Sequence, residues 1–147
     1  MSARVRKFMG LPAADRRLFV SAAIALVKAR LMVTLVPVRK ILRPVTPRTA
    51  AISADLDAAR IGWAVETAAH FVPSAKNCLV RAIAGRELLA RHGLASEIRL
   101  GIGKTSADRL SGHAWLECGQ RIITGEGEHL DFAAMPVGDA GRKRLAS

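Results

Sequence analysis

The chain has 147 residues, of which 50% are hydrophobic, and a formal net charge of +11 at pH 7. This length provides one hydrophobic core rather than two full domains, and the composition excludes a disordered chain. The two cysteines form no Cys-x-x-Cys pair, so the sequence predicts neither a disulfide framework nor a metal site.

The positive charge is concentrated at the start of the chain. Residues 1–50 carry 11 basic residues and one acid, Asp15, whereas residues 51–147 are nearly neutral. A cationic segment attracts nucleic acid, anionic lipid or an acidic protein, and charge alone does not choose among them. The first apolar run ends without a small-residue cleavage site, so we expect a cytoplasmic protein with reduced thiols.

The first predicted element is a long helix over residues 13–36, which ends before Pro37. Lys28 and Arg30 lie in its middle and argue against a helix that spans the bilayer. We expect a core or interface helix, and a position on a membrane surface is the alternative. Its apolar residues do not gather on one face, so partners are expected to cover it.

A connector follows the long helix, because residues 37–54 contain three prolines. It divides the chain into a basic helical segment with its connector, residues 1–54, and a second part, residues 55–147. This second part begins with a predicted helix over residues 55–69.

The next predicted helix runs from Cys78 to about His92. Asn77 is a good N-cap, which places Cys78 at the first helical position, and Gly93 provides the stop. The thiol is therefore predicted to lie at the mouth of a helix.

The remaining elements predict a small antiparallel sheet. Apolar residues from Ile98 to Ile102 alternate with polar residues or glycine, which indicates a half-buried strand over residues 96–103. After a polar loop, residues 113–117 and 121–124 read as a hairpin with a tight turn. Helices followed by a sheet predict an α+β domain.

Cys78 and His113 are the candidate catalytic pair. A thiol reacts as its thiolate, and an unperturbed thiol has a pKa near about 8.5. The unpaired N–H groups of a helix start stabilise an anion, and an imidazole could take the proton if the hairpin packs across that start. The same amides, with the Asn77 or Ser74 side chain, could hold an oxyanion.

A structural interpretation of these residues stands beside the catalytic one. Cys78 could be a small buried residue of an apolar helix, and His113 a packed histidine beside Trp115. Trp115 shares the strand face of His113, where it could shield the imidazole from water or belong to the core. A metal site made of Cys78, His113 and Cys118 lacks the expected motif spacing.

Two segments resemble the lasso-peptide leader peptidases, which are transglutaminase-like cysteine proteases that also occur in a stand-alone form. They read NCLVRAIAGRELLARHGLASEIRLGIGK, residues 77–104, and GHAWLECGQRIITGEGEHLDFAAM, residues 112–135. The shared features are Cys-Leu opening a helix, Leu-Leu-x-x-x-Gly closing it, a Gly-Ile-Gly strand and His-Ala-Trp-x-Glu. The N-terminal apolar helix is similar to the helical lead-in of these enzymes.

The resemblance implies a papain-like or transglutaminase-like core, with Cys78 as the nucleophile and His113 as the general acid and base. The family carries an aspartate on the following strand, and this sequence departs from that pattern. With the turn centred on Gly119, His113 lies opposite Gly125, and Glu126 is the nearest carboxylate. Asp131 is the second candidate to orient the imidazole, and Glu128 is the third. In the alternative, all three acids are solvated and none of them orients the imidazole.

The function that the resemblance implies is cleavage of the leader from a lasso precursor through a thioester, without a cofactor. Its implied partners are a separate leader-recognition protein and an asparagine-synthetase-like cyclase. One alternative is an amine acyltransferase with the same mechanism. The other is a non-catalytic basic module that contacts a membrane or nucleic acid, although six aromatic residues and no tyrosine argue against nucleic acid.

Overall fold

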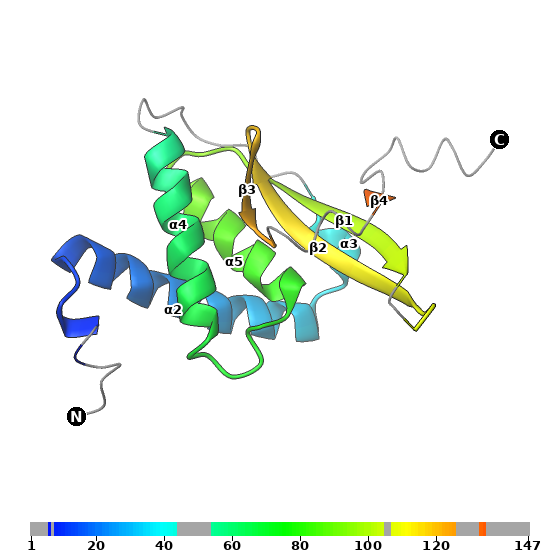
Figure 1. Ribbon diagram of the computed structural model, residues 1–147, viewed down its shortest axis with the longest axis horizontal. Coiled ribbons are helices and arrows are strands. Elements are labelled where there is room, and N and C mark those ends of the chain that lie inside the picture. Colours follow the sequence, from blue (N-terminus) through cyan, green and yellow to red (C-terminus); the bar gives the residue numbers. More distant parts are fainter. Residues whose placement is uncertain (1–5, 7, 44–53, 105–106, 126–132, 135–147) are drawn as a thin grey trace.

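The protein was analysed as a computed structural model, which describes residues 6, 8–43, 54–104, 107–125 and 133–134; residues 54–56, 133 and 134 are described by their backbone alone. Four helices precede four strands in the described chain (Figure 1). The helices are α2 (Ala13–Leu35), α3 (Val38–Ile41), α4 (Ala54–Ala69) and α5 (Cys78–Arg91), and the strands are β1 (Glu97–Lys104), β2 (Leu110–Cys118), β3 (Arg121–Thr124) and β4 (Ala133–Ala134). The predicted α+β class is confirmed.

Helix α2 confirms the predicted long helix. Its last turn is closed by the Val36 N–H, which donates to the Met32 carbonyl, and Pro37 then ends it because proline has no N–H to donate. The connector prediction was incomplete, since α3 begins directly after Pro37. The fixed φ of proline is compatible with a helix start, so a short helix forms there.

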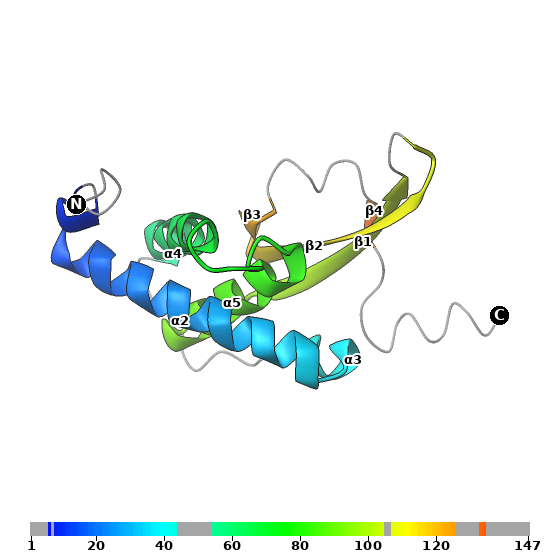
Figure 2. The ribbon, with the colours of Figure 1, turned by 90° about the horizontal axis from the view of Figure 1, so that it is seen from below.

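Helix α5 lies between α2 on one side and the sheet on the other, and α4 lies beside it (Figures 1 and 2). The apolar side chains of α2 that face inward belong to the same core as α4, α5 and the strands. They are Ala22, Ala25, Leu26 and Ala29, each at most 1% exposed. The predicted boundary near residue 54 therefore separates segments that share one core, and it stays a prediction.

Two glycines allow the helices to approach the sheet closely. A Cβ atom at Gly85 of α5 would lie 2.7 Å from the Leu116 side chain, and one at Gly62 of α4 would lie 2.7 Å from the Ile123 carbonyl oxygen. Any larger residue would force the helix away from the strand. The Gly85 contact brings α5 close to β2, and the Gly62 contact brings α4 close to β3.

The strands are ordered β3-β2-β1-β4 and are antiparallel where they pair. Strand β2 is longer than predicted, because its pairing with β1 continues to Lys104 opposite Leu110. The predicted burial of alternate residues in β1 holds for Ile98 and fails for Ile102, which is 45% exposed. The Lys104 end of the hairpin extends past the helices, so nothing from that layer covers it (Figure 1).

Candidate active site

Cys78 occupies the first position of α5, as predicted, and its side chain is half-buried. The Asn77 side-chain oxygen accepts hydrogen bonds from the Leu79 N–H at 2.9 Å and the Val80 N–H at 3.4 Å. This cap anchors the first turn, whose N–H groups and dipole favour an anion at the thiol. Asn77 therefore caps the helix through its side-chain oxygen. Its side-chain NH₂ is the group that could donate to an oxyanion.

His113 lies on β2 and is 5% exposed. Its ring stacks on the ring of Trp115, with centroids 6.1 Å apart and planes 22° from parallel. Gly101 pairs with His113 on the neighbouring strand, and its lack of a side chain leaves room beside the imidazole. The site thus places the imidazole in a nearly dry setting against an indole.

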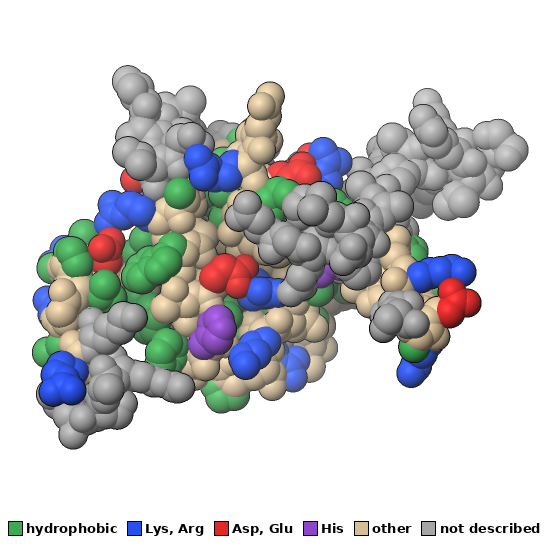
Figure 3. All heavy atoms as spheres, in the orientation of Figure 1, with side chains coloured by type: hydrophobic (Ala, Val, Ile, Leu, Met, Phe, Trp, Pro, Cys, Tyr) green, Lys and Arg blue, Asp and Glu red, His purple; other side chains and the backbone are tan. Residues whose placement is uncertain are grey.

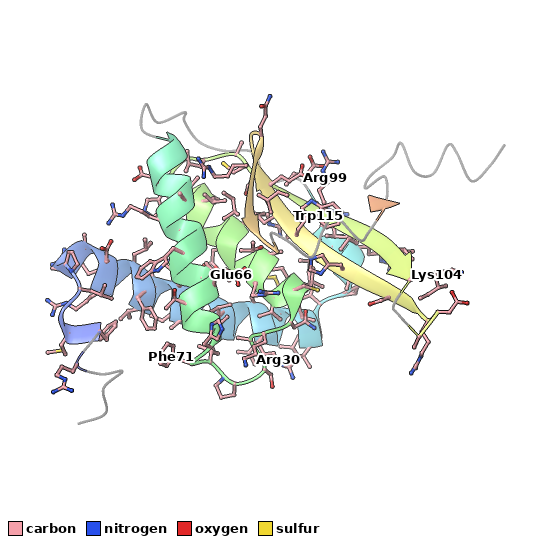
Figure 4. All side chains as sticks on the ribbon, in the orientation of Figure 1. Arg30, Glu66, Phe71, Arg99, Lys104 and Trp115 are labelled. Atoms are coloured by element: carbon pink, nitrogen blue, oxygen red, sulfur yellow. The ribbon has the colours of Figure 1, made fainter. Side chains whose placement is uncertain are left out.

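Trp115 is held by polar contacts on the same face of the sheet. Its indole N–H donates to a Glu117 carboxylate oxygen at 2.8 Å, and Arg99 donates to the other oxygen at 3.2 Å. Glu117 is half-buried and forms an ion pair across the strands with Arg99. Figure 4 shows Arg99 and Trp115 together over the β1–β2 pair.

Gly125 follows β3 and lies against the His113 imidazole. A Cβ atom there would be 3.0 Å from His113 Nε2 and 3.1 Å from the Trp115 Cβ, and the residue has a φ of +82°. Both the space and the backbone conformation therefore require glycine. The chain that follows Gly125 begins beside Nε2, which is the place where an orienting acid would have to start.

The predicted register of the hairpin was wrong. Cys118 pairs with Arg121, so the turn consists of Gly119 and Gln120 and is not centred on Gly119. A bulge at Ile123 then adds a further shift, so that Thr124 pairs with Leu116. Gly125 nevertheless meets His113, because the imidazole reaches past the end of β3. The candidate orienting acids Glu126, Glu128 and Asp131 lie outside the described residues.

A chain of contacts that the sequence analysis missed links the imidazole region to the start of α5. Arg81, one turn after Cys78, forms an ion pair with Glu66 of α4 at 2.7 Å. The other Glu66 oxygen accepts from the Gly125 N–H at 3.4 Å. In Figure 4 Glu66 points from α4 toward α5. The spacing of Arg81 from Cys78 was visible in the sequence, but nothing in the sequence identified its partner on another helix.

The Glu66 carboxylate joins Arg81 of α5 to the Gly125 N–H, so it links the N-terminal half of α5 to the chain beside His113. On β2, alternate residues face opposite sides, so Leu116 packs on α5 and His113 lies on the other face. However, β3 ends opposite Leu116, so in the described chain β2 has no paired neighbour beside His113 on that edge. Gly125, just after β3, lies against the His113 imidazole, and its N–H donates to Glu66 of α4.

A cleft of about 340 Å³ runs along this region between α4 and β3. The exposed Trp63 indole lines this cleft, together with the Glu66–Arg81 ion pair, Arg121 and Gly125. Figure 3 shows acidic and basic side chains meeting on this face, where Figure 4 labels Glu66. The cleft is open to solvent; Cys78 and His113 do not line it, but Gly125, which lies against the imidazole, does.

Among the described residues, no group of three or more His, Cys, Asp or Glu side chains is arranged to hold a metal ion. Cys118, at the hairpin turn, is half-buried and pairs with Arg121 in the strand register. Cys78, His113 and the adjoining cleft are therefore the candidate active site.

The family model described as the transglutaminase-like superfamily matches residues 22–137 of the chain. That range includes most of α2, both candidate catalytic residues and the three acids that follow β3. No curated protein and no solved structure matches the chain.

Proposed function

This chain belongs to the transglutaminase-like superfamily, and from that premise we propose that it is a cysteine peptidase that removes the leader from a lasso-peptide precursor. Enzymes of this class work by acyl transfer at a cysteine. The observation that supports the proposal is Cys78 at the start of an Asn-capped helix in a fold that also buries His113 in the adjoining sheet. The motif resemblance over residues 77–135 supports the choice of substrate.

In the first half-reaction, His113 takes the Cys78 thiol proton and the thiolate attacks the scissile carbonyl carbon. The resulting oxyanion accepts hydrogen bonds from helix-start N–H groups, with the Asn77 amide as a further donor. The C–N bond then breaks, and His113 returns its proton to the amine of the departing core peptide. The leader remains bound to Cys78 as a thioester.

In the second half-reaction, His113 takes a proton from water, and the hydroxide attacks the thioester carbonyl. The C–S bond breaks, the thiolate regains the proton, and the leader leaves with a free carboxylate. Trp115 limits water around the imidazole, which strengthens the electrostatic contacts made there. An acid after Gly125, with Glu126 first in order, would hold the imidazole in the productive tautomer.

The cleft between α4 and β3 is the proposed place for the precursor chain beside the scissile bond. Trp63 offers an apolar surface at its open end, and the Glu66–Arg81 pair forms its polar end. We expect a separate recognition protein to deliver the leader, and a separate asparagine-synthetase-like enzyme to cyclise the freed core. No cofactor enters the proposed reaction.

The proposal is tested with the precursor peptide encoded beside the gene, with the recognition protein added. Cys78→Ala and His113→Ala are expected to abolish detectable processing, whereas Cys118→Ser is the matched thiol control and should process at the wild-type rate. Processing that survives both Cys78→Ala and His113→Ala would remove the peptidase proposal.

The superfamily also favours a second candidate, transfer of the acyl group to an amine. Mass spectrometry of the leader fragment separates the two reactions. A free carboxylate indicates hydrolysis, whereas an amide to an added amine indicates acyl transfer. Replacing Glu126, Glu128 and Asp131 one at a time by their amides then identifies the orienting acid, because only that variant should lose rate strongly, by up to about ten-thousandfold.

A further inference from the structure

Helix α2 has an apolar face that the described protein does not cover. Five side chains form this face, here named the α2 stripe, at successive spacings of four, three, four and four residues. They are Val20 (49% exposed), Ile24 (53%), Val27 (49%), Leu31 (56%) and Leu35 (79%). At about 100° per residue these positions share one side of the helix, over about 22 Å of its length.

The opposite side of α2 is buried in the protein core. Ala22, Ala25, Leu26 and Ala29 are at most 1% exposed and pack in the cluster that includes α4 and α5. Helix α2 is long and apolar enough to cross a membrane by length and composition, and 22% of its most apolar window is buried. Spanning a bilayer would require the helix to leave its core, so its geometry favours contact along one side.

Cations flank the α2 stripe on both sides. By helical angle, Arg17 and Lys28 lie along one edge and Arg30 along the other, and all three are exposed. Lys28 also pairs with Glu87 of α5 at 3.3 Å, so Arg17 and Arg30 are the cations that the proposal uses. Figure 4 shows Arg30 pointing away from the body of the protein. Asp15, the one acid of α2, lies on the side facing α4, where it pairs with Arg60. The stripe is thus aliphatic at its centre and positive at its borders.

We propose that the α2 stripe binds the surface of an anionic membrane, with the helix axis parallel to the bilayer. Aliphatic side chains at the centre of the face enter the boundary between headgroups and acyl chains, while flanking lysines and arginines contact lipid phosphates. Residues 1–50 carry 11 basic residues and one acid, which matches this charge pattern. Figure 2 shows α2 along the outer side of the helical layer, away from the sheet.

A second copy of this chain fits the α2 stripe less well. Pairing two such stripes would bring the cationic borders of both helices together, and α2 provides no acid on this side to neutralise them. An anionic membrane offers an apolar interior to the aliphatic side chains of the stripe and negatively charged headgroups to the cations that flank it. The proposal does not depend on the catalytic activity, because the stripe lies on the side of α2 away from α5 and the sheet.

The test measures sedimentation of the full chain with vesicles. Vesicles of equal parts phosphatidylcholine and phosphatidylglycerol are expected to bind the protein, with binding weakened by salt, and vesicles of phosphatidylcholine alone to bind it less. Combined replacement of Ile24, Val27 and Leu31 by Gln should lower the partition coefficient at least about tenfold. Leu110→Gln, at an exposed leucine of β2, is the matched control and should bind as the wild type does.

A charge variant keeps the test independent of any folding effect of the triple replacement. Arg17→Gln with Arg30→Gln should weaken binding by about fivefold for each removed charge, while circular dichroism stays unchanged. The proposal is overturned if neither vesicle sediments the protein, or if the triple variant binds as tightly as the wild type. A wild-type dimer that the triple variant converts to a monomer, without vesicle binding, would instead assign the stripe to self-association.

Discussion

Helix α2 and the region around the start of α5 differ in how they use contacts. Helix α2 is apolar on two sides, one packed in the core and one exposed, and its contacts are mostly aliphatic. The Cys78–His113 region depends instead on single polar or steric contacts, such as the Asn77 cap and the close approach at Gly125. Helix α2 therefore depends on buried aliphatic area, whereas the candidate site depends on a few individually placed polar and steric contacts.

The largest expected effect tests the two sides of α2 against each other. Leu26→Ala removes a side chain that is fully buried and should lower the free energy of unfolding by about 2–5 kcal/mol. Leu31→Ala, on the exposed α2 stripe, should change it by less than about 0.5 kcal/mol. Urea denaturation measures both. Equal losses in the two variants would mean that the stripe is covered within the protein.

The next effect tests the steric requirement beside the imidazole. Gly125→Ala should lower kcat/KM for precursor processing by about a hundredfold, because its Cβ would displace His113 Nε2 or the backbone. Gly119→Ala is the matched control, since it has a similar φ of +61° and open space around it. In both variants the alanine must adopt a positive φ, which is unfavourable for a residue with a side chain. If Gly119→Ala loses as much activity, the imidazole contact is not what matters.

A smaller effect is expected from the contact that links α4 to both parts of the site. Glu66→Ala removes the bonds to Arg81 and the Gly125 N–H, and should lower kcat by about tenfold with little change in KM. Glu66→Gln should restore part of the rate, because its amide oxygen still accepts from Gly125. Glu87→Ala breaks an exposed pair with Lys28 and should leave the kinetics unchanged.

Failure of the Glu66→Gln variant to recover any rate would contradict this positioning role. A rise in KM alone would indicate that Glu66 contacts the substrate in the cleft rather than positioning Gly125. The split between kcat and KM is therefore the informative measurement.

The smallest effect concerns the buried hydroxyl of Thr124, the last residue of β3. The Thr124 hydroxyl oxygen is buried and has no hydrogen-bond partner among the described residues. Thr124→Val keeps the shape and should stabilise the fold by up to about 1 kcal/mol in thermal or urea unfolding. Thr34→Val, which removes an exposed bond to the Arg30 carbonyl, should change stability less than this. A loss above about 1 kcal/mol in Thr124→Val would show that the hydroxyl has a partner.

Local patterns in the sequence predicted much of the fold. The end of α2 at Pro37, the cap at Asn77 and the stop at Gly93 each depend on chemistry within one or two turns of the chain. Such features are readable because proline, asparagine and glycine act on the neighbouring backbone. The exposed end of β1 at Ile102 was not readable, because its burial depends on how far the helical layer extends.

The candidate site was predictable in its main members and not in its supporting contacts. Cys78 and His113 were identified from motif and helix position, and their catalytic roles remain predictions. The Glu66–Arg81 pair and the close contact at Gly125 join residues that are far apart in the sequence. The hairpin register also differed from expectation, because neither the two-residue turn at Gly119 and Gln120 nor the one-residue bulge is encoded in the alternation of β3.

The sequence by itself determined the long helices and most of the sheet, the position of the thiol on its helix, and the concentration of positive charge in the first third; it did not indicate α3 or β4. Only the tertiary structure decided which side of α2 is buried, and which side chains meet beside His113. The physical reason is that capping and periodicity act through adjacent backbone atoms. Packing between distant elements depends instead on distances and angles that no single segment specifies.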